Sequence, residues 1–594
     1  MKADTRAAVR YCARIVAGLA LLALLAGVGL LALSCIPYET IRARADAFTL
    51  DGSADTLTRD LFARMVARLR WLAGGLAVAA VLLFKGREPI AQQVVSLARS
   101  AAQAWAGARA GAASAWQRTP LSHRVALIAV TLSAVGVRLF YLGLPMRYDE
   151  SYTVMRYAAK PLYIALTDYS APNNHLFHTL LVYIALRLFG WHEWAIRLPA
   201  LLAGVALVPA GYALARKLYG LSAGLIAAAL IAGSSALVEY SVNARGYTIV
   251  AALFLTLWLL ATWLAGHSNA AVWLLFAALA ALGLWTVPIM LYPVGIVGLW
   301  LLLSWIAHEP ARAGRRALAS RWHELALALG VTAFLTALCY APVMITAGPG
   351  AVTGNVFVTP QPWRQFGSAL VASLGPVWAQ WNRDIPLPLG ILLAAAAVGA
   401  TIAHGRLARW QVPPLVPVLL WCPVLLILQR VVPYRRVWLF LLPLYLTLAA
   451  AGLTAAAARL VRGHKTYPVV AALAAVALAV GLALNVVLAR SVYFSNETET
   501  LRDAPYIVAM LRDELRPGDR VLTVAPSDTI LEYYFTVQGV PLTYLVSESG
   551  PGGRVFVVVN DVAGDDSPDR LGQWLKQAAL FARFPFSRLY LVLP

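Results

Sequence analysis

The chain has 594 residues, of which 60% are apolar and only 13% are charged. A soluble domain carries about a quarter charged residues. The composition therefore excludes a soluble enzyme, a disordered tail and a fibrous repeat, and it predicts a polytopic membrane protein. The net charge of +21 comes from basic residues spread between apolar segments rather than from one dense basic run, which argues against nucleic acid as a partner.

Two apolar runs near the N-terminus, residues 13–35 and 71–84, are predicted to cross the membrane. Basic residues precede the first run, which is longer than the apolar core of a cleavable signal peptide. It is therefore predicted to be a true span with its N-terminus inside. The Ala-rich basic stretch after the second run is predicted to form an interfacial or cytoplasmic helix. Residues 1–124 thus form an N-terminal extension with two spans and a basic cytoplasmic linker.

The next apolar run, residues 125–142, crosses outward and places the following segment, MRYDESYT, on the extracytoplasmic side. Residues 175–190 are also apolar, but at 16 residues they are shorter than the roughly 20 that a span needs. If this stretch lies along the outer interface and residues 198–215 cross instead, the Arg-Lys pair that follows falls inside, as the positive-inside rule requires. This assignment of membrane spans gives roughly thirteen spans, with a transmembrane module over 125–491.

The tail, residues 492–594, has a different character. The turn-forming RPGDR precedes a strand-like VLTVAP, and RVFVVVND and SRLYLVLP are further strand candidates. Ser527 is predicted to cap a helix that runs to about Gln538. The tail is therefore predicted to be a small α/β domain on the outer face. The whole chain is predicted to be an all-α polytopic membrane protein of about 13 transmembrane helices with this C-terminal extracytoplasmic domain.

The first outer loop carries an acidic pair, Asp149 and Glu150, directly after a span. Tyr148 precedes the pair, and Arg138 lies at least one turn back inside the span. A carboxylate at the membrane border can act as a general base on a hydroxyl or ligate a cation. The alternative is a solvated acidic loop start, and the residues alone leave both interpretations open.

A second polar group lies before and within the short apolar stretch, and it comprises Asp168, Asn174, His175 and His178. Asn and Pro are ordinary residues at a helix start, so a structural role is the alternative to a binding role. His175 and His178 are three residues apart and share a helix face. A metal pair there lacks any further ligand motif, so the metal site is left open.

Outward-facing arginines form the remaining candidates. Arg245 lies at the outer end of a span beside Tyr247, and Arg364 lies in a long aromatic outer loop. A short outer loop adds Tyr434, Arg435 and Arg436. Basic residues outside break the charge rule and require an anionic partner, either lipid headgroups or a substrate phosphate. For Arg245 the alternative is a snorkelling interfacial anchor.

Three segments, VRLFYLGLPMRYDESYT, APNNHLFHTLL and SVNARGYTIVAALF, resemble successive signatures of glycosyltransferase family 39. This family is part of the GT-C superfamily of membrane transferases that use polyprenyl-phosphate sugars. Its relatives include protein O-mannosyltransferases and the transferase that places aminoarabinose on lipid A. The similarity is clearest over residues 125–265, and it implies the GT-C fold.

The resemblance also implies residue roles. Asp149 matches the family's first catalytic carboxylate, which is proposed to be the base acting on the acceptor hydroxyl, and Glu150 completes the acidic pair. Asn174 and His175 match a stretch that contributes to donor-phosphate and acceptor binding. The Tyr-Arg-Arg loop resembles the place where relatives hold the lipid phosphate. The chain lacks the second acidic residue that some relatives carry in the next outer loop, so no cofactor is required and a divalent cation is left open.

The resemblance implies a hexosyl- or pentosyltransferase that moves a sugar from a polyprenyl-phosphate donor to a hydroxyl acceptor with inversion. The acceptor is a glycan, a lipid such as lipid A or a protein, and membrane lipids are further partners. The implied location is the bacterial inner membrane, with the active site and the tail in the periplasm. The alternatives are an O-antigen ligase or polymerase that uses a diphosphate-linked glycan, and a transporter or flippase. A transporter would carry ionisable groups near the bilayer midplane, whereas those of this chain cluster at span ends.

Overall fold

The computed structural model describes residues 2–46, 58–171, 173–308, 314–348, 350–354, 359–460, 466–546, 553–567 and 571–593. The chain forms two compact units. The N-terminal unit comprises Met1–Ala113 and Asn269–Val272, and the main unit comprises Ser114–Ser268 and Trp273–Pro594. The tail belongs to the main unit, so it packs with the transmembrane helices rather than standing apart from them.

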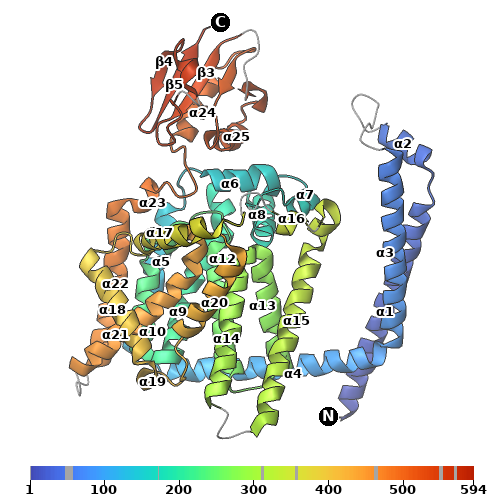
Figure 1. Cartoon of the computed structure of the whole chain (residues 1–594), viewed down its shortest axis with the longest axis vertical. Coiled ribbons are helices and arrows are strands. Elements are labelled where there is room, and N and C mark those ends of the chain that lie inside the picture. The colour runs from blue at the N-terminus through green and yellow to red at the C-terminus, as the bar shows by residue number, and fades with distance from the viewer. Residues whose placement is uncertain are drawn as a thin grey trace. The chain divides into compact units, whose positions relative to one another are not determined.

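The N-terminal unit is built from α1 (Lys2–Ser34), α2 (Tyr38–Asp46), α3 (Arg59–Lys85) and α4 (Arg87–Gln117), the last of which ends in the main unit. Helices α1 and α3 run side by side (Figure 1), and small residues let their backbones approach. A Cβ added at Gly27 would lie 3.1 Å from the carbonyl oxygen of Ala73. Leucines on the outside of the pair are exposed, Leu22 by 63% and Leu82 by 65%, as expected for helices that face lipid.

Nine helices of the described residues are long and apolar enough to cross a membrane. They are α1, α3, α5 (Leu121–Tyr141), α9 (Glu193–Tyr219), α12 (Tyr247–Leu264), α14 (Leu291–His308), α15 (Gly314–Ala347), α21 (Leu442–Leu460) with the preceding turn η3 (Arg435–Leu441), and α22 (Tyr467–Ala489). Helices α10 (Leu221–Ala232) and α11 (Ser235–Ser241) meet at 61° and form a tenth span if the bent pair crosses as one. The chain is a multi-pass membrane protein, as predicted.

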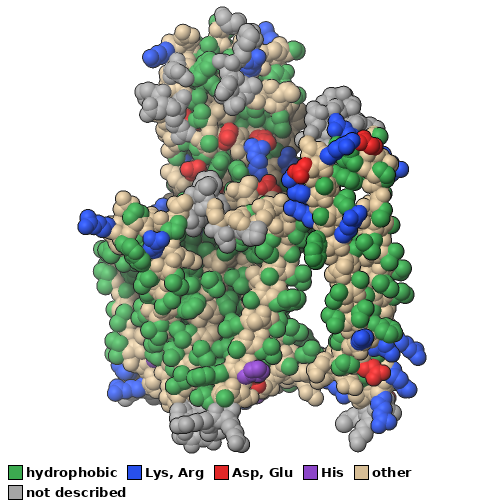
Figure 2. Space-filling model, turned by 45° about the vertical axis from the view of Figure 1, so that its right-hand side comes forward, with side chains coloured by type: hydrophobic (Ala, Val, Ile, Leu, Met, Phe, Trp, Pro, Cys, Tyr) green, Lys and Arg blue, Asp and Glu red, His purple; other side chains and the backbone are tan. Residues whose placement is uncertain are grey.

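Four shorter apolar helices complete this set in the described chain: α8 (Leu176–Phe189), α13 (Ala270–Thr286), α18 (Leu387–Ile402) and α20 (Leu415–Gln429). The predicted total of about thirteen spans is reached if α13, α18 and α20 also cross. Helix α8 is the stretch predicted to lie along the outer interface, and with 14 residues it is the shortest of these four helices. Figure 2 shows hydrophobic side chains over the bundle of the main unit, with basic side chains beyond both ends.

Several further helices gather at one end of this bundle (Figure 1): α6 (Tyr148–Tyr152), α7 (Leu162–Thr167), α16 (Gly350–Thr353), α17 (Trp363–Trp381) and α23 (Ser491–Phe494). The π-helix η1 (Thr153–Ala158) continues α6, and η2 (Pro288–Met290) and α19 (His404–Leu407) complete the helical part. A π-helical turn is rare and is frequent at functional sites. This end of the bundle carries the loops that were predicted to face outward.

The tail folds as a small α/β domain, which confirms the prediction. Its elements are α24 (Ala504–Glu514), β1 (Arg520–Leu522), α25 (Ser527–Gln538), η4 (Leu542–Tyr544), β2 (Leu545–Val546), β3 (Val555–Asn560), α26 (Gln573–Leu575), β4 (Ala579–Arg583) and β5 (Ser587–Val592). The strand order is β2-β1-β3-β5-β4. Strand β1 pairs in parallel with β2 and β3, whereas β5 pairs antiparallel with β3 and β4.

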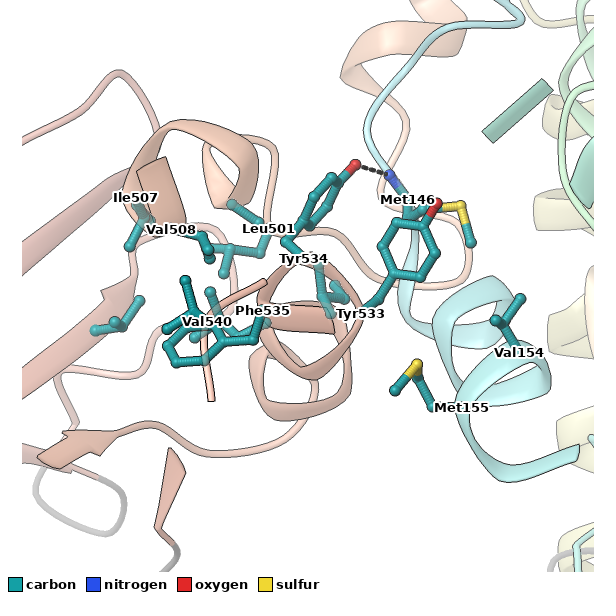
Figure 3. Packing of buried hydrophobic residues seen from close by; sticks show 14 of the residues in the cluster. Met146, Val154, Met155, Leu501, Ile507, Val508, Tyr533, Tyr534, Phe535 and Val540 are labelled. Carbon is teal, nitrogen blue, oxygen red and sulfur yellow. Dashed lines mark hydrogen bonds between the residues drawn. The ribbon is translucent and has the colours of Figure 1, made fainter. Parts of the chain in front are cut away.

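Helix α25 attaches this domain to the first outer loop (Figure 3). Tyr533 and Tyr534 pack in one buried cluster with Met146, Val154 and Met155. The Met146 amide donates a hydrogen bond of 2.9 Å to the Tyr534 hydroxyl, drawn as a dashed line in Figure 3. Burying these large side chains removes apolar area from water and fixes the loop between the bundle and the tail. The acidic pair is therefore held on a rigid element rather than on a free loop.

Candidate active site

The acidic pair lies in the first turn of α6, where carboxylates complement the positive end of the helix dipole. The Arg147 amide donates to Oε2 of Glu150 at 3.0 Å, which closes the start of this helix. Successive helical residues point about 100° apart because the helix has 3.6 residues per turn. Asp149 and Glu150 therefore face different neighbours.

Glu150 is fully buried and fully paired. Arg197 donates to both of its carboxylate oxygens, at 2.8 and 2.7 Å, and the Ala244 amide adds a hydrogen bond of 2.7 Å. Burial raises the pKa of Glu150, but the charge of Arg197 and these hydrogen bonds outweigh it and hold the pKa below its usual value. These hydrogen bonds engage both oxygens of Glu150, and the catalytic role predicted for Glu150 stays a prediction. Glu150 holds the start of α6 against the bundle.

Asp149 is paired differently. Its Oδ2 makes no hydrogen bond, and its side chain is 13% exposed. Arg245 Nε lies 3.8 Å from this oxygen, and Arg436 Nη2 lies 3.9 Å from it. Both distances exceed hydrogen-bond length. Two guanidinium groups therefore face one carboxylate without closing on it.

Arg245 is held by the break between α11 and α12 and is only 3% exposed. Its Nη1 donates to the carbonyl of Asn173 at 2.7 Å and to the hydroxyl of Thr153 at 3.3 Å. These contacts come from the loop before α8 and from η1, so three segments distant in sequence meet at this guanidinium. Its Nε has no hydrogen-bond partner and is turned toward Asp149.

His175 completes this side of the site. The Gly246 amide donates to its Nδ1 at 3.0 Å, and Nη2 of Arg245 lies 3.0 Å from its Nε2. Position 246 must be glycine, because a Cβ there would lie 2.4 Å from Cγ2 of Thr286. Burial, and then the charge of Arg245, lower the pKa of His175 well below its usual value, so the ring is neutral.

The two arginines of the Tyr-Arg-Arg loop contact different partners. Arg436 donates from Nε to the Tyr247 hydroxyl at 3.1 Å and stacks over the Tyr434 ring at 4.6 Å. Its two Nη groups make no hydrogen bond with any described residue. Arg435 instead forms an ion pair of 2.7 Å with Glu497, and its side chain is 52% exposed. Of the two arginines predicted to bind phosphate, only Arg436 faces Asp149.

Two predicted substrate-binding residues lie away from this site. Arg138 is fully buried in the bundle, where it donates to the Ser241 hydroxyl and to the carbonyls of Ala134 and Ala232. It braces the bent pair α10 and α11, and the substrate contact predicted for Arg138 stays a prediction. Arg364 is exposed on α17, and among the described residues no contact joins its side chain to Asp149 or its arginines.

The polar residues before and within α8 mostly stabilise the chain. Asn174 donates to the carbonyls of Asp168 and Ala165 and accepts from Thr179, so its amide is fully used. The Asp168 carboxylate accepts from the Ser170 amide in a local turn. These contacts give Asn174 and Asp168 a structural role, and the binding roles predicted for them stay predictions.

Two further candidates have other surroundings. His178 is completely buried with no hydrogen bond at either ring nitrogen, and burial, followed by the charge of Arg245, lowers its pKa to about 3. It packs beside the site as a neutral ring. Tyr148 is half-buried beside Asp149, and burial raises its pKa to about 12.

A second carboxylate network had not been predicted. Glu239 on α11 is fully buried between Arg147, at 2.5 Å, and Arg383, at 2.6 Å. Arg147 also donates to the carbonyls of Val492 and Glu497 at the start of the tail. The available signal was an isolated carboxylate inside an apolar run, which marks a buried ionisable group. Glu497 carried no such signal, because it lies in a polar linker.

No group of three or more His, Cys, Asp or Glu side chains within the described ranges could hold a metal ion. The predicted pair, His175 and His178, does not converge on one point: His175 bonds Gly246, and His178 is enclosed. A cation also does not fit beside Asp149, because two arginines already face that carboxylate. Within the part of the chain that the structure describes, no residues form a divalent-cation site.

Comparison with known proteins finds a family match over part of the chain. Residues 172–340 match a family described as dolichyl-phosphate-mannose-protein mannosyltransferase. This match includes His175 and Arg245 but neither Asp149 nor Arg436, and it confirms the predicted resemblance to the GT-C superfamily. No protein of curated function matches the chain.

Solved structures are also similar to the chain. ArnT from Cupriavidus metallidurans in the apo state is 16% identical, covers 81% of this chain and 100% of its own length, and has a TM-score of 0.48. The same protein bound to undecaprenyl phosphate is 14% identical over 80% of this chain and 98% of its own, with a TM-score of 0.48. The Archaeoglobus fulgidus oligosaccharyltransferase AglB, in complex with an inhibitory peptide and a dolichol-phosphate, is 12% identical over 69% of this chain and 63% of its own, with a TM-score of 0.43.

Proposed function

We propose that the chain transfers a sugar from a polyprenyl-phosphate donor to a hydroxyl acceptor at the outer face of the bacterial inner membrane. The family match supports a glycosyltransferase, and the family description names a dolichyl-phosphate-linked sugar. The observation that carries the proposal is the geometry of Asp149. Its free oxygen faces Arg245 and Arg436 but bonds to neither, so a base and an anion site lie side by side.

The donor phosphate binds between Arg245, Arg436 and His175. A backbone amide can only donate, so Nδ1 of His175 accepts from Gly246 and the neutral ring carries its proton on Nε2. Nε2–H and Nη2 of Arg245 are then two donors 3.0 Å apart. Two donors that face each other repel. A phosphate oxygen between them removes this repulsion, because it accepts a hydrogen bond from each.

The charge balance favours a monophosphate donor over the diphosphate donor of a ligase or polymerase. Two guanidinium groups and one carboxylate, with His175 neutral, leave a net charge of +1. A sugar phosphodiester carries one negative charge, whereas a diphosphate diester carries two. The Arg435–Glu497 pair adds no net charge. The site therefore matches a phosphodiester and gains attraction as the departing phosphate becomes dianionic.

The reaction is a direct displacement. Asp149 takes the proton of the acceptor hydroxyl, and the hydroxyl oxygen bonds to the anomeric carbon from the face opposite the phosphate. The bond between that carbon and the phosphate oxygen breaks, and polyprenyl phosphate leaves with the electron pair. The anomeric configuration is inverted. Arg436, oriented by the Tyr247 hydroxyl, and Arg245 stabilise the charge that develops on the leaving group.

Purified full-length protein and a radiolabelled polyprenyl-phosphate sugar test the proposal. Transfer, or slow donor hydrolysis without acceptor, is expected from the wild type. Passage of the labelled lipid across a vesicle membrane with no bond broken would instead establish the flippase alternative.

The orientation is tested separately in a cysteine-free background. Ser170, exposed before α8, is predicted to face the periplasm, and Ser320, exposed near the start of α15, to face the cytoplasm. In intact cells an impermeant thiol reagent should label Ser170→Cys and not Ser320→Cys. Labelling of Ser320→Cys alone would reverse the assigned orientation.

A further inference from the structure

A cavity of about 520 Å³ lies in the main unit where the tail meets the first outer loop. Its lining includes Thr523 after β1, Asp528 and Glu532 on α25, Leu542 before β2, and Arg156 on η1. Strand β1 lies between β2 and β3 and runs parallel to both, so the chain passes to opposite sides of β1. The carboxyl end of a strand at such a switch is where α/β sheets bind ligands.

The polar groups of this cavity are arranged for a ligand. Asp528 and Glu532 are four residues apart on α25 and share one helix face. Glu532 receives both Nη groups of Arg156, at 3.1 and 3.3 Å. Thr523 is only 7% exposed, and its hydroxyl has no hydrogen-bond partner. A buried hydroxyl without a partner is costly, so a ligand that reached the Thr523 hydroxyl would be favoured.

A stripe of side chains runs from Arg156 in the cavity lining to Tyr148, the residue before Asp149 in the chain. Tyr148, Tyr152 and Arg156 recur every four residues along α6 and η1. The two tyrosine rings are 5.8 Å apart, and the Arg156 guanidinium lies 6.0 Å from the Tyr152 ring. Burial raises the pKa of Tyr148 to about 12, and the charges of Asp528 and Asp149 add to the effect. Tyr148 therefore lies within the fields of both Asp528 in the cavity lining and Asp149.

We propose that this cavity binds a saccharide unit of the acceptor and presents its hydroxyl to Asp149 across Tyr148 and Tyr152. Carboxylates accept hydrogen bonds from sugar hydroxyls, Arg156 and Thr523 donate to sugar oxygens, and tyrosine rings stack on the apolar face of a sugar ring. The inference rests on the proposed function and narrows its acceptor to a glycan or glycolipid rather than a protein.

Photocrosslinking in intact native cells tests the ligand class without turnover. Leu542→benzoylphenylalanine places the probe at a cavity residue that is 42% exposed, and Val537→benzoylphenylalanine is the matched control on α25, 40% exposed and not among the lining residues. After irradiation, mass spectrometry of the purified full-length protein should find a saccharide mass on the peptide that contains position 542 only. A polypeptide adduct at 542, or no adduct there, would overturn the proposal.

Two further variants report on the recognising groups. Asp528→Asn and Glu532→Gln keep the side-chain shape and remove the charge, and each should lower the yield of the 542 saccharide adduct about tenfold, the scale for weakening a hydrogen bond to a charged group. An unchanged yield in both variants would contradict the recognition by carboxylates.

The outcome is distinguishable from failure of the proposed function. If the wild type neither binds nor hydrolyses the labelled donor while the saccharide adduct forms, the transferase proposal fails and the cavity assignment stands. If the donor is hydrolysed and no saccharide adduct forms, the cavity assignment fails alone.

Discussion

Buried arginines meet carboxylates in two regions of the main unit, and the regions differ in how closely the charges approach. In the first, Glu150 and Glu239 bond to their arginines at 2.5 to 2.8 Å. In the second, Asp149 faces Arg245 and Arg436 at 3.8 and 3.9 Å, and its Oδ2 forms no hydrogen bond. The same residue types are thus arranged once as closed pairs and once as an open group.

The difference distinguishes arginine–carboxylate pairs that stabilise the fold from a group that is open to a substrate. A closed buried pair is bonded on all sides, so it resists movement and offers nothing to a ligand. An open group retains unpaired donors and acceptors, which a substrate can satisfy in place of water. Closed pairs on both flanks of α6 hold the open group in position. The variants below remove charged groups from one region or the other. The measurements then show whether stability, donor binding or turnover changes.

The largest expected effect is on stability at Glu150. Glu150→Gln removes the charge that Arg197 requires and leaves a buried guanidinium uncompensated. Breaking such a pair costs about 3–5 kcal/mol. We expect a large drop in the thermal midpoint and in the yield of folded protein in detergent. A Glu150→Gln protein of wild-type stability with a specific loss of turnover would return Glu150 to the catalytic group.

The next effect is on turnover at Asp149. Asp149→Asn keeps the side-chain shape and removes the base, so turnover should fall about 10²-fold or more. Folding should be preserved, because Oδ2 makes no hydrogen bond to lose. Donor binding should be retained or tightened, since a negative charge near the phosphate disappears. Transfer by folded Asp149→Asn protein at a near-normal rate would contradict the base assignment.

The two neighbouring arginines allow a matched test of the donor site. Arg436→Gln should weaken donor binding about 10- to 100-fold, the scale of a hydrogen bond to a charged group. Arg435→Gln breaks only the half-exposed pair with Glu497, so donor affinity should change by less than about fivefold. Equilibrium binding of the labelled donor measures both. Equal losses in the two variants would show that Arg435 leaves Glu497 to bind the phosphate.

The smallest expected effect is a pH dependence of stability at His178. Its pKa is about 3 in the folded chain against 6.5 for an ordinary histidine, so between these values the unfolded state binds more protons. Stability is therefore lost as the pH falls below 6.5, by about 1 kcal/mol at pH 5.5. The drop in thermal midpoint from pH 7.5 to 5.5 should be smaller in His178→Leu. An identical drop in that variant would assign the acid sensitivity to other groups.

Much of the fold followed from local sequence signals. Long apolar runs can lie only in lipid or a protein core, so their length and the basic residues between them predicted a multi-pass bundle. Alternating apolar residues and turn signals predicted the α/β tail. A polar group such as Asn174 gave no comparable signal, because the same residues serve a turn or a ligand, and here they serve the turn.

The sequence by itself determined the membrane class, the helical bundle, the small C-terminal α/β domain and the acidic pair as a point of interest. Only the tertiary structure decided which carboxylate stays open, since Asp149 and Glu150 differ through Arg197, Arg245 and Arg436, which lie far along the chain. The tertiary structure also pairs Arg435 with Glu497, whereas Arg436 faces Asp149. The physical reason is that apolar burial depends on local composition, whereas an ion pair depends on distances of a few ångströms between segments that only folding brings together.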